Sequence, residues 1–291
     1  MEQGGRALHV AVCAATAAAV AAAVHVVWQR EAIVRKVQAL GEVRLADSKG
    51  YLRPVRISDA ARIFSLVDAD RKYLQEWLPW VKYVQSQADE EFFLGTCEHG
   101  QRQGTHVVYA ICSPLARDST GKTNGAGVND IVGLISFNAI DTTRRMVYIG
   151  CDKAVVDGSF NPPALSVHRM CVRLACNRYW LASSAQGHGL MTCAVNALCD
   201  VAFSEQLGYF DHVEICAAEQ NRKSRAIPER IDGFVHLPTV RDWGPTGGAH
   251  GDVKLCSYVK SRDSSCAQRA AEARVDNINN LPDGLVRVSF M

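Results

Sequence analysis

Residues 185–192, Ala185-Gln186-Gly187-His188-Gly189-Leu190-Met191-Thr192, decide how the rest of this chain is interpreted. Two glycines here allow the backbone to approach a ligand closely. The residues that follow have helical spacing, and the first amides of a helix have no intrahelical acceptor. A helix N-terminus of this kind can bind phosphate oxygens. By itself, however, a glycine-rich turn before a helix is more often a plain connection.

The helix that begins after this turn is predicted over residues 189–207, with Gly208 as its C-cap. Downstream, residues 212–218 form a strand candidate that is rich in β-branched and small apolar side chains. A short helix is predicted over 223–230, and further strands are predicted from Gly233 and over 253–259.

Upstream of the turn, strand candidates lie at 52–55, 106–112, 131–138 and 145–150, and residues 179–181 form a strand end. Helices are predicted from Ser58-Asp59, in a second stretch that Pro79 should end, and over 90–99. Strands and helices in this order predict an α+β or mixed α/β domain with a mostly antiparallel sheet.

The composition of the 291-residue chain is that of an ordinary globular protein, with 48% hydrophobic and 21% charged residues. The net charge of +2 gives no reason to expect a nucleic-acid partner. None of the 11 cysteines has zinc-site spacing, so we expect no metal and interpret the cysteines as buried free thiols. A catalytic cysteine is the alternative, without a His–Asp pair to support it.

Residues Ala7–Trp28 carry no formally charged side chain and are mainly Ala and Val. A membrane-spanning helix needs about 20 such residues. Three interpretations stay open: a membrane anchor with the remaining chain facing the cytosol, a cleaved signal, and a soluble Ala-rich helix or a gene-model artefact. We therefore expect a cytoplasmic protein, with membrane association through residues 7–28 as an option.

A second motif follows the turn by some thirty residues, and it ends in Gly233-Phe234. Together the two motifs resemble the GNAT superfamily of acyl-CoA N-acyltransferases, in particular the branch of ribosomal-protein N-terminal alanine and serine acetyltransferases. The resemblance covers roughly residues 51–260. The residues that carry it are Leu52-Arg53-Pro54, Trp77-Leu78-Pro79-Trp80, Tyr179-Trp180-Leu181, Gln186–Thr192, Ala202-Phe203, Leu207-Gly208, Val213-Glu214-Ile215, Asn221–Arg230 and Gly233-Phe234.

The resemblance implies an N-acetyltransferase that uses acetyl-CoA as co-substrate and acts on an amine, either a protein N-terminus or a small molecule. The backbone amides at the start of the helix would hold the CoA diphosphate, and the strand ending at Leu181 would bind the pantetheine arm. The implied cofactor-binding residues are Trp180, Leu181, Gln186, Gly187, His188, Gly189, Leu190, Met191, Thr192, Asn221 and Ser224.

Glu214 and Ser224 are the candidate catalytic residues that the resemblance suggests. Glu214 would deprotonate the attacking ammonium, directly or through water, and Ser224 would protonate the departing thiolate. The alternatives are a surface carboxylate for Glu214 and a helix cap or surface residue for Ser224. Trp77 and Trp80 are candidate acceptor-pocket residues, and core packing explains them equally well.

One segment departs from the family pattern, because 28 residues (151–178) stand between Tyr148-Ile149-Gly150 and Tyr179-Trp180-Leu181. They interrupt the strand that should hold the pantetheine arm. Either Leu174–Leu181 forms the strand and the preceding residues loop away, or the segment is a retained intron, which sequencing of the transcript would reveal. The expected organisation is a helix and linker over 1–50, a catalytic domain over 51–260 with this insertion, and a tail over 261–291.

The interruption keeps a second hypothesis open, in which a catalytically impaired GNAT-like domain binds CoA or a protein partner. A third hypothesis is a membrane-tethered structural protein, which only residues 7–28 support. The acceptor cannot be identified from sequence, because variable loops shape acceptor pockets.

Overall fold

The computed structural model describes residues 2–114, 130–150, 179–208, 210–243 and 253–263. The helices are α1 (Glu2–Gln38), α2 (Ala60–Ala69), α3 (Arg71–Leu74), α4 (Gln87–Arg102), α7 (Leu190–Phe203) and α8 (Arg222–Arg225). The strands are β1 (Val43–Arg44), β2 (Tyr51–Pro54), β3 (Val107–Ser113), β4 (Asp130–Asp141), β5 (Met146–Ile149), β6 (Trp180–Leu181), β7 (His212–Ala218), β8 (Phe234–Trp243) and β9 (Val253–Ser261). Five short 3₁₀ helices are η1 (Ala46–Ser48), η2 (Ile57–Asp59), η3 (Pro79–Tyr83), η4 (Ser183–Ala185) and η5 (Pro228–Arg230).

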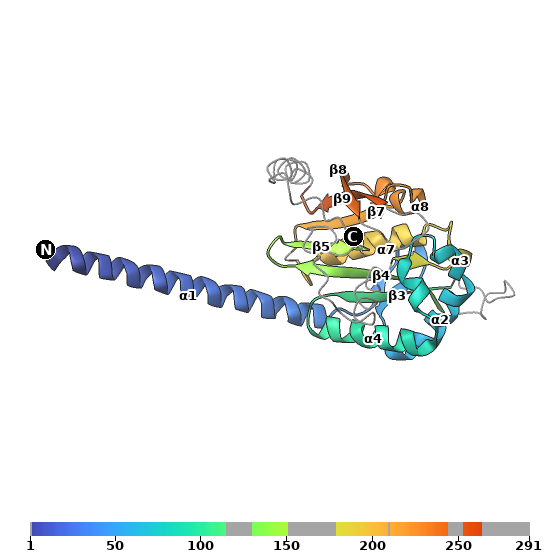
Figure 1. The fold of residues 1–291 in the computed structure, drawn as a ribbon, viewed down its shortest axis with the longest axis horizontal. Coiled ribbons are helices and arrows are strands. Elements are labelled where there is room, and N and C mark those ends of the chain that lie inside the picture. The colour runs from blue at the N-terminus through green and yellow to red at the C-terminus, as the bar shows by residue number, and fades with distance from the viewer. Residues whose placement is uncertain (1, 115–129, 151–178, 209, 244–252, 264–291) are drawn as a thin grey trace, which may run out of the picture.

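A single sheet with the order β1-β2-β3-β4-β5-β7-β9-β8 forms the centre of the domain, and β6 pairs with β4 beside this path. All neighbouring strands are antiparallel except β5 and β7. This confirms the predicted α+β class and the mostly antiparallel sheet. Helices cover both faces, as Figure 1 shows.

Two apolar cores lie on opposite faces of the sheet. On one face, α2 and α4 pack on alternate residues of β3 such as Val108 and Ala110. On the other face, α7 and the C-terminal end of α1 pack on the intervening residues Val107, Tyr109 and Ile111. The alternation follows from the two-residue period of a strand, and it explains why β3 is buried on both sides.

Strands β5 and β6 occupy one continuous line along β4. Phe137 pairs with Ile149, and three residues back along β4, Leu134 pairs with Trp180. In an unbroken antiparallel strand, the third residue after Ile149 would face Leu134, and Trp180 takes that place. A Cβ atom added to Gly150 would lie 3.0 Å from the Cβ atom of Tyr179. The 28 residues 151–178 are therefore inserted between two adjacent positions of one strand; they lie outside the described residues, as do residues 264–291 of the expected tail.

Gly133 of β4 makes the close approach of β6 possible. A Cβ atom at this position would lie 2.1 Å from the carbonyl oxygen of Trp180 and 2.9 Å from Cα of Leu181. Real side chains do not tolerate such contacts, so this part of the sheet requires a glycine.

Three helix boundaries differ from the predicted ones. Helix α7 ends at Phe203, because Ser204 turns into extended backbone (φ −74°, ψ 164°); Gly208 is not its C-cap. The helix predicted over 223–230 is two pieces, α8 and η5, since Pro228 cannot continue the hydrogen-bond ladder and instead begins η5. Pro79 likewise begins η3.

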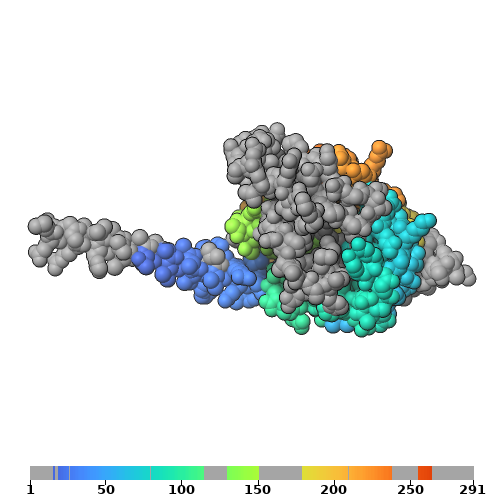
Figure 2. All heavy atoms as spheres, in the orientation of Figure 1, coloured from blue at the N-terminus to red at the C-terminus, as the bar shows by residue number. Residues whose placement is uncertain are grey.

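Helix α1 contains the predicted segment Ala7–Trp28 and extends away from the domain, as Figures 1 and 2 show. Its last turns are anchored, because Ile33 and Val37 are buried in the core beside α7. Among the residues that the structure describes, no helix has both the length and the apolar character needed to cross a bilayer. The expectation of a membrane anchor is therefore not supported.

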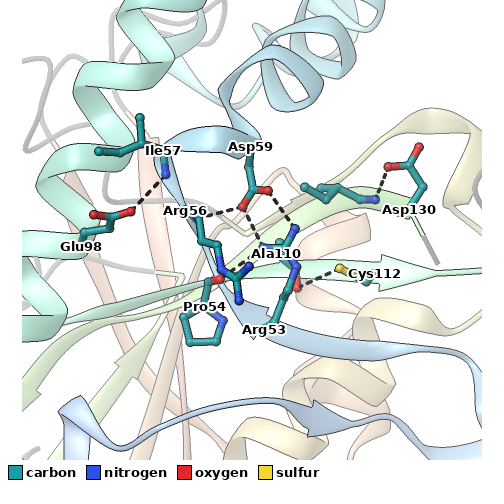
Figure 3. A network of polar contacts seen from close by, with 10 residues as sticks. Arg53, Pro54, Arg56, Ile57, Asp59, Glu98, Ala110, Cys112 and Asp130 are labelled. Atoms are coloured by element: carbon teal, nitrogen blue, oxygen red, sulfur yellow. Dashed lines mark hydrogen bonds and ion pairs between the residues drawn. The ribbon is translucent and has the colours of Figure 1, made fainter. Parts of the chain in front are cut away.

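An ion pair fixes β2 to the start of α2. The Arg53 guanidinium donates two hydrogen bonds of 2.8 Å to the Asp59 carboxylate, which also accepts the backbone N–H of Arg56 at 2.8 Å. Figure 3 shows this network, with Ile57 of the same turn donating to Glu98 of α4. The Asp59 side chain is only 10% exposed, so the pair satisfies a carboxylate that would otherwise be desolvated without a partner.

We expect the substitution Arg53→Met to lower the free energy of unfolding by about 2–3 kcal/mol, because it leaves the Asp59 carboxylate buried with one donor. Urea unfolding followed by circular dichroism measures the change. Arg44→Met, at an exposed arginine of β1, is the matched control and should change the free energy by less than about 0.5 kcal/mol. Equal stability of the two variants would contradict the structural role of the pair.

A chain in which Gly150 is bonded directly to Tyr179 should fold with a Tm at or above that of the full chain. The β4 ladder keeps its register in this variant, and a loop no longer has to be closed. Thermal unfolding of both chains tests this. The variant Gly133→Val, which forces β6 away from β4, should instead lower the Tm. Aggregation of the shortened chain would show that the two half-strands are not equivalent to one strand.

Candidate active site

The described structure places a fork in the sheet next to the inserted segment. Strands β5 and β7 run parallel and pair from Met146 with His212 to Ile149 with Ile215. Beyond these residues β6 continues along β4, and β7 continues along β9 with Cys216 opposite Ser257. No pairing joins β6 to β7 in the described residues. We call this divergence the fork; its two arms are β6 and the second half of β7.

The backbone of β6 presents polar groups to the fork. Ala182 donates its N–H to the carbonyl oxygen of Val132 in β4 at 2.8 Å. Because backbone groups alternate between the two edges of a strand, the N–H and C=O of Leu181 point away from β4. The Leu181 carbonyl oxygen accepts the side-chain amide of Gln186 at 3.1 Å, which ties the following loop to this edge.

Two residues of the helical segment before η3 hold that loop in place. The Asp70 carboxylate accepts the backbone N–H of Ser183 at 2.6 Å and its hydroxyl at 2.7 Å. The Tyr73 hydroxyl donates to the Gln186 side-chain oxygen at 3.3 Å. On the opposite side, the Lys223 ammonium lies 4.9 Å from the centre of the Tyr73 ring. Tyr73 therefore contacts both arms of the fork.

The loop passes directly into α7, whose first amides are available to a ligand. Gly187 (φ 82°) and Gly189 (φ 71°) have left-handed backbone conformations, which other residues adopt only with strain. Gly189 is the N-cap and supplies no side-chain acceptor. The first intrahelical bond runs from Cys193 N–H to the Gly189 carbonyl, so the N–H groups of residues 190–192 have no partner within the helix.

The predicted cofactor-binding residues of this loop contribute in two ways. Leu190 and Met191 bury their side chains in the core, so only their backbone can face a ligand. Gly187 and His188 are exposed, and Thr192 is half-buried. Trp180, at 4% exposed, packs into the core on the α2–α4 face. A ligand at this loop would thus meet mostly backbone.

On the other arm, Asn221 caps α8 and fixes Ser224. The Asn221 side-chain oxygen accepts the N–H of Ser224 at 3.1 Å. A network with β9 holds this turn, since the Tyr258 hydroxyl donates to Glu229 at 2.7 Å and accepts from Arg225 at 3.0 Å. Burial, followed by the bond to Glu229, raises the pKa of Tyr258 to about 12, which keeps the phenol protonated.

Ser224 lies close to the Tyr179 phenol, which comes from the opposite arm. Burial holds the pKa of Tyr179 far above its usual value, while Ser224 and Arg230 oppose the shift. The Tyr179 hydroxyl is buried and makes no hydrogen bond within the described residues; it approaches Ser224 without reaching hydrogen-bond geometry. Two hydroxyl groups from the two arms thus face each other across the fork.

Glu214 is fully buried on β7, one residue before the last pair with β5. Its carboxylate accepts hydrogen bonds from the hydroxyl of Ser257 and, at 3.8 Å, from the thiol of Cys216. The interpretation as a surface carboxylate is therefore wrong. Because strand side chains alternate, Glu214 lies on the face opposite Val213 and Ile215, which pack with α7.

The two predicted acceptor-pocket residues differ in environment. Trp80 is 1% exposed and belongs to the core between α2, α4 and the sheet, whereas Trp77 is half-buried. Core packing accounts for Trp80. Cys193, Cys199 and Cys216 are free, in agreement with their interpretation as thiols. No cluster of metal-ligating side chains occurs in the part of the chain that the structure describes.

Sequence reasoning missed Asp70, Tyr73 and the Arg225–Glu229–Tyr258 network. The first two lie more than 100 residues before their partners. Arg225 and Glu229 stand within the recognised motif, but their partner Tyr258 comes from a separate strand. Only the arginine and glutamate at i and i+4 carried a local signal.

Residues 51–234 match the family model described as "Acetyltransferase (GNAT) domain", which is more than half of the chain. The chain belongs to the GNAT acetyltransferase family. It is also 42% identical over 209 residues to the "Putative ribosomal N-acetyltransferase YdaF" of Bacillus subtilis (strain 168), covering 72% of this chain and 90% of that protein. The family and the enzyme class expected from the sequence are confirmed.

Solved GNAT structures share the fold. One is the ribosomal L7/L12 α-N-protein acetyltransferase RimL in complex with coenzyme A, with a TM-score of 0.56, 20% identity and coverage of 77% of this chain and 99% of that chain. Another is the microcin C7 self-immunity acetyltransferase MccE in complex with acetyl-CoA and AMP, with a TM-score of 0.55, 19% identity and coverage of 75% and 98%. The protein is thus an N-acetyltransferase that transfers acetyl from acetyl-CoA to a primary amine.

The residues at the fork fit acetyl-CoA as the co-substrate. The diphosphate is an anion that requires N–H donors, and the first turn of α7 leaves three backbone donors without helical partners. The pantetheine arm carries amides, which match the polar backbone edge of Leu181. Acetyl-CoA supplies an activated thioester there, and the protein supplies its positioning.

Proposed function

We propose that this GNAT enzyme acetylates the N-terminal amine of a ribosomal protein. The name of the 42%-identical relative, a ribosomal N-acetyltransferase, supports this acceptor class. The preserved fork supports activity itself. Although 28 residues interrupt the strand, β5 and β6 keep one register on β4, so the surface expected to bind the cofactor remains intact.

In this proposal the cofactor lies along the fork. The amides of Gly187 to Thr192 hold the diphosphate at the positive end of α7, assisted by the helix dipole. The Leu181 backbone binds the pantetheine arm, and the arm passes toward Asn221 and Ser224 on α8. The Gln186 side chain acts indirectly, because it is already engaged by Leu181 and Tyr73.

The chemistry then requires two proton transfers. Glu214 accepts a proton from the acceptor ammonium through water, since its carboxylate is buried and hydrogen-bonded by Ser257. The free amine attacks the thioester carbonyl, and a backbone N–H near Leu181 stabilises the oxygen that becomes negative. Ser224 gives its proton to the departing thiolate. The neighbouring Tyr179 phenol, kept protonated by burial, can replace that proton.

A direct assay tests the acceptor class. The purified protein is mixed with acetyl-CoA and short synthetic peptides that begin with alanine or serine, and release of the CoA thiol is measured. We expect turnover on peptides with a free N-terminus and none on the same peptides with an acetylated N-terminus, since the amine is the nucleophile. Turnover on free lysine or spermidine, with none on any peptide, would contradict a protein N-terminal acceptor.

The catalytic assignments predict how two conservative variants behave. Glu214→Gln and Ser224→Ala should each lower kcat by about 100-fold or more, because each removes one proton-transfer step, while the KM for acetyl-CoA changes little. Steady-state kinetics over pH 6–9 measures both parameters. Glu219→Gln, at the exposed residue just after β7, is the control and should keep full activity. A Glu214→Gln enzyme with normal kcat would exclude this residue as the base.

A further inference from the structure

Lys49 places an ammonium group at the N-terminus of α7, although it lies outside the residues matched by the family model. Its Nζ atom lies 3.6 Å from Sγ of Cys193, in the first turns of the helix. The same atom would lie 3.4 Å from a Cβ atom added to Gly189, the helix N-cap. Lys49 is therefore next to the amides that we expect to hold the diphosphate.

The turn that carries Lys49 is held from several sides. The Lys49 N–H donates to the Ala46 carbonyl at 3.2 Å, and its own carbonyl accepts the Ser113 hydroxyl at 2.8 Å. Gly50 packs so closely on β3 that an added Cβ atom would lie 1.9 Å from the Cys112 carbonyl oxygen. The backbone of Lys49 is thus fixed against the sheet, and its side chain reaches α7 from a defined origin.

The electrostatic environment of this ammonium lacks a strong anion. A helix N-terminus carries a partial positive charge of roughly half a unit, so the cation and the helix repel each other. The first turn of α7 contains no acidic residue. The partner of Lys49 is Asp47, 3.7 Å away with a side chain 76% exposed, and such surface pairs contribute little. The thiol of Cys193 is a weak acceptor.

We propose that Lys49 is a ligand of the CoA diphosphate and acts together with the first amides of α7. This inference rests on the proposed placement of the cofactor at the fork and identifies a further residue of that site. A doubly charged diphosphate would neutralise both the ammonium and the helix end. Ammonium–phosphate hydrogen bonds are stronger than neutral ones, so Lys49 would contribute a substantial part of the affinity for the cofactor.

Isothermal titration with four probes tests the proposal: CoA, 3′-dephospho-CoA, inorganic pyrophosphate and pantetheine. We expect Lys49→Met to weaken the binding of CoA, 3′-dephospho-CoA and pyrophosphate about tenfold. Pantetheine, which has no phosphate, should bind the variant and the wild-type protein equally. Lys49→Arg, which keeps the charge, should restore most of the affinity.

Two control variants separate this role from general effects of charge or packing. Lys36 donates to the Glu205 carbonyl, just past the opposite end of α7, so Lys36→Met removes the same charge at the other helix end. Cys193→Ala removes the only other contact of the Lys49 ammonium with α7 in the described residues. Both variants should bind CoA as the wild-type protein does.

Several outcomes would overturn the assignment. Lys49→Met with wild-type affinity for CoA would do so, and the proposed acetyl transfer would then stand if peptides are still acetylated. A penalty that disappears with 3′-dephospho-CoA would move Lys49 to the 3′-phosphate and overturn the assignment to the diphosphate. A protein that binds neither CoA nor pyrophosphate would overturn both proposals. Pyrophosphate binding that depends on Lys49, without turnover on any peptide, would support this site and contradict the proposed acceptor.

Discussion

Pairing along β4 is the constraint on which the rest of this structure depends. It holds β5 and β6 in one register although the chain leaves the sheet between Gly150 and Tyr179. On its other edge the same line pairs with β7 only as far as Ile149 and Ile215. A strand bonded on one side throughout and on the other side for half its length must end in a fork. The polar backbone edge left at Leu181 follows from this geometry.

Contacts from distant parts of the chain fix the two arms of the fork. Asp70 and Tyr73 bind the loop after β6, and Tyr258 binds Arg225 and Glu229 beside Ser224. These contacts are hydrogen bonds to groups whose strands no longer pair across the fork. They replace the ladder that an ordinary sheet would have there. The arms are therefore ordered independently of each other, and a ligand that lies between them does not have to organise them first.

The sequence predicted the order of strands and helices well, because hydrophobic periodicity is a local property. It also identified the loop from Gln186 to Thr192, since glycine spacing and helix start are local as well. It failed at Gly208, where Ser204 ended the helix first, and within 223–230, where Pro228 divided the helix. The burial of Glu214 and the contacts of Tyr73 depend on partners far away in the sequence, and no local pattern encodes them.

The interruption after Gly150 shows which part of a strand the fold needs. Closing a loop costs free energy that grows only slowly with its length, whereas losing the pairing of β6 would leave backbone groups of β4 without partners. Gly133, which admits the Trp180 carbonyl at close range, makes the return to β4 specific, because a shift of one residue would reverse the side chains of Trp180 and Leu181 between the two cores. Register is thus set by packing on both faces rather than by chain continuity. For this reason a site that depends on one strand can persist when that strand is divided.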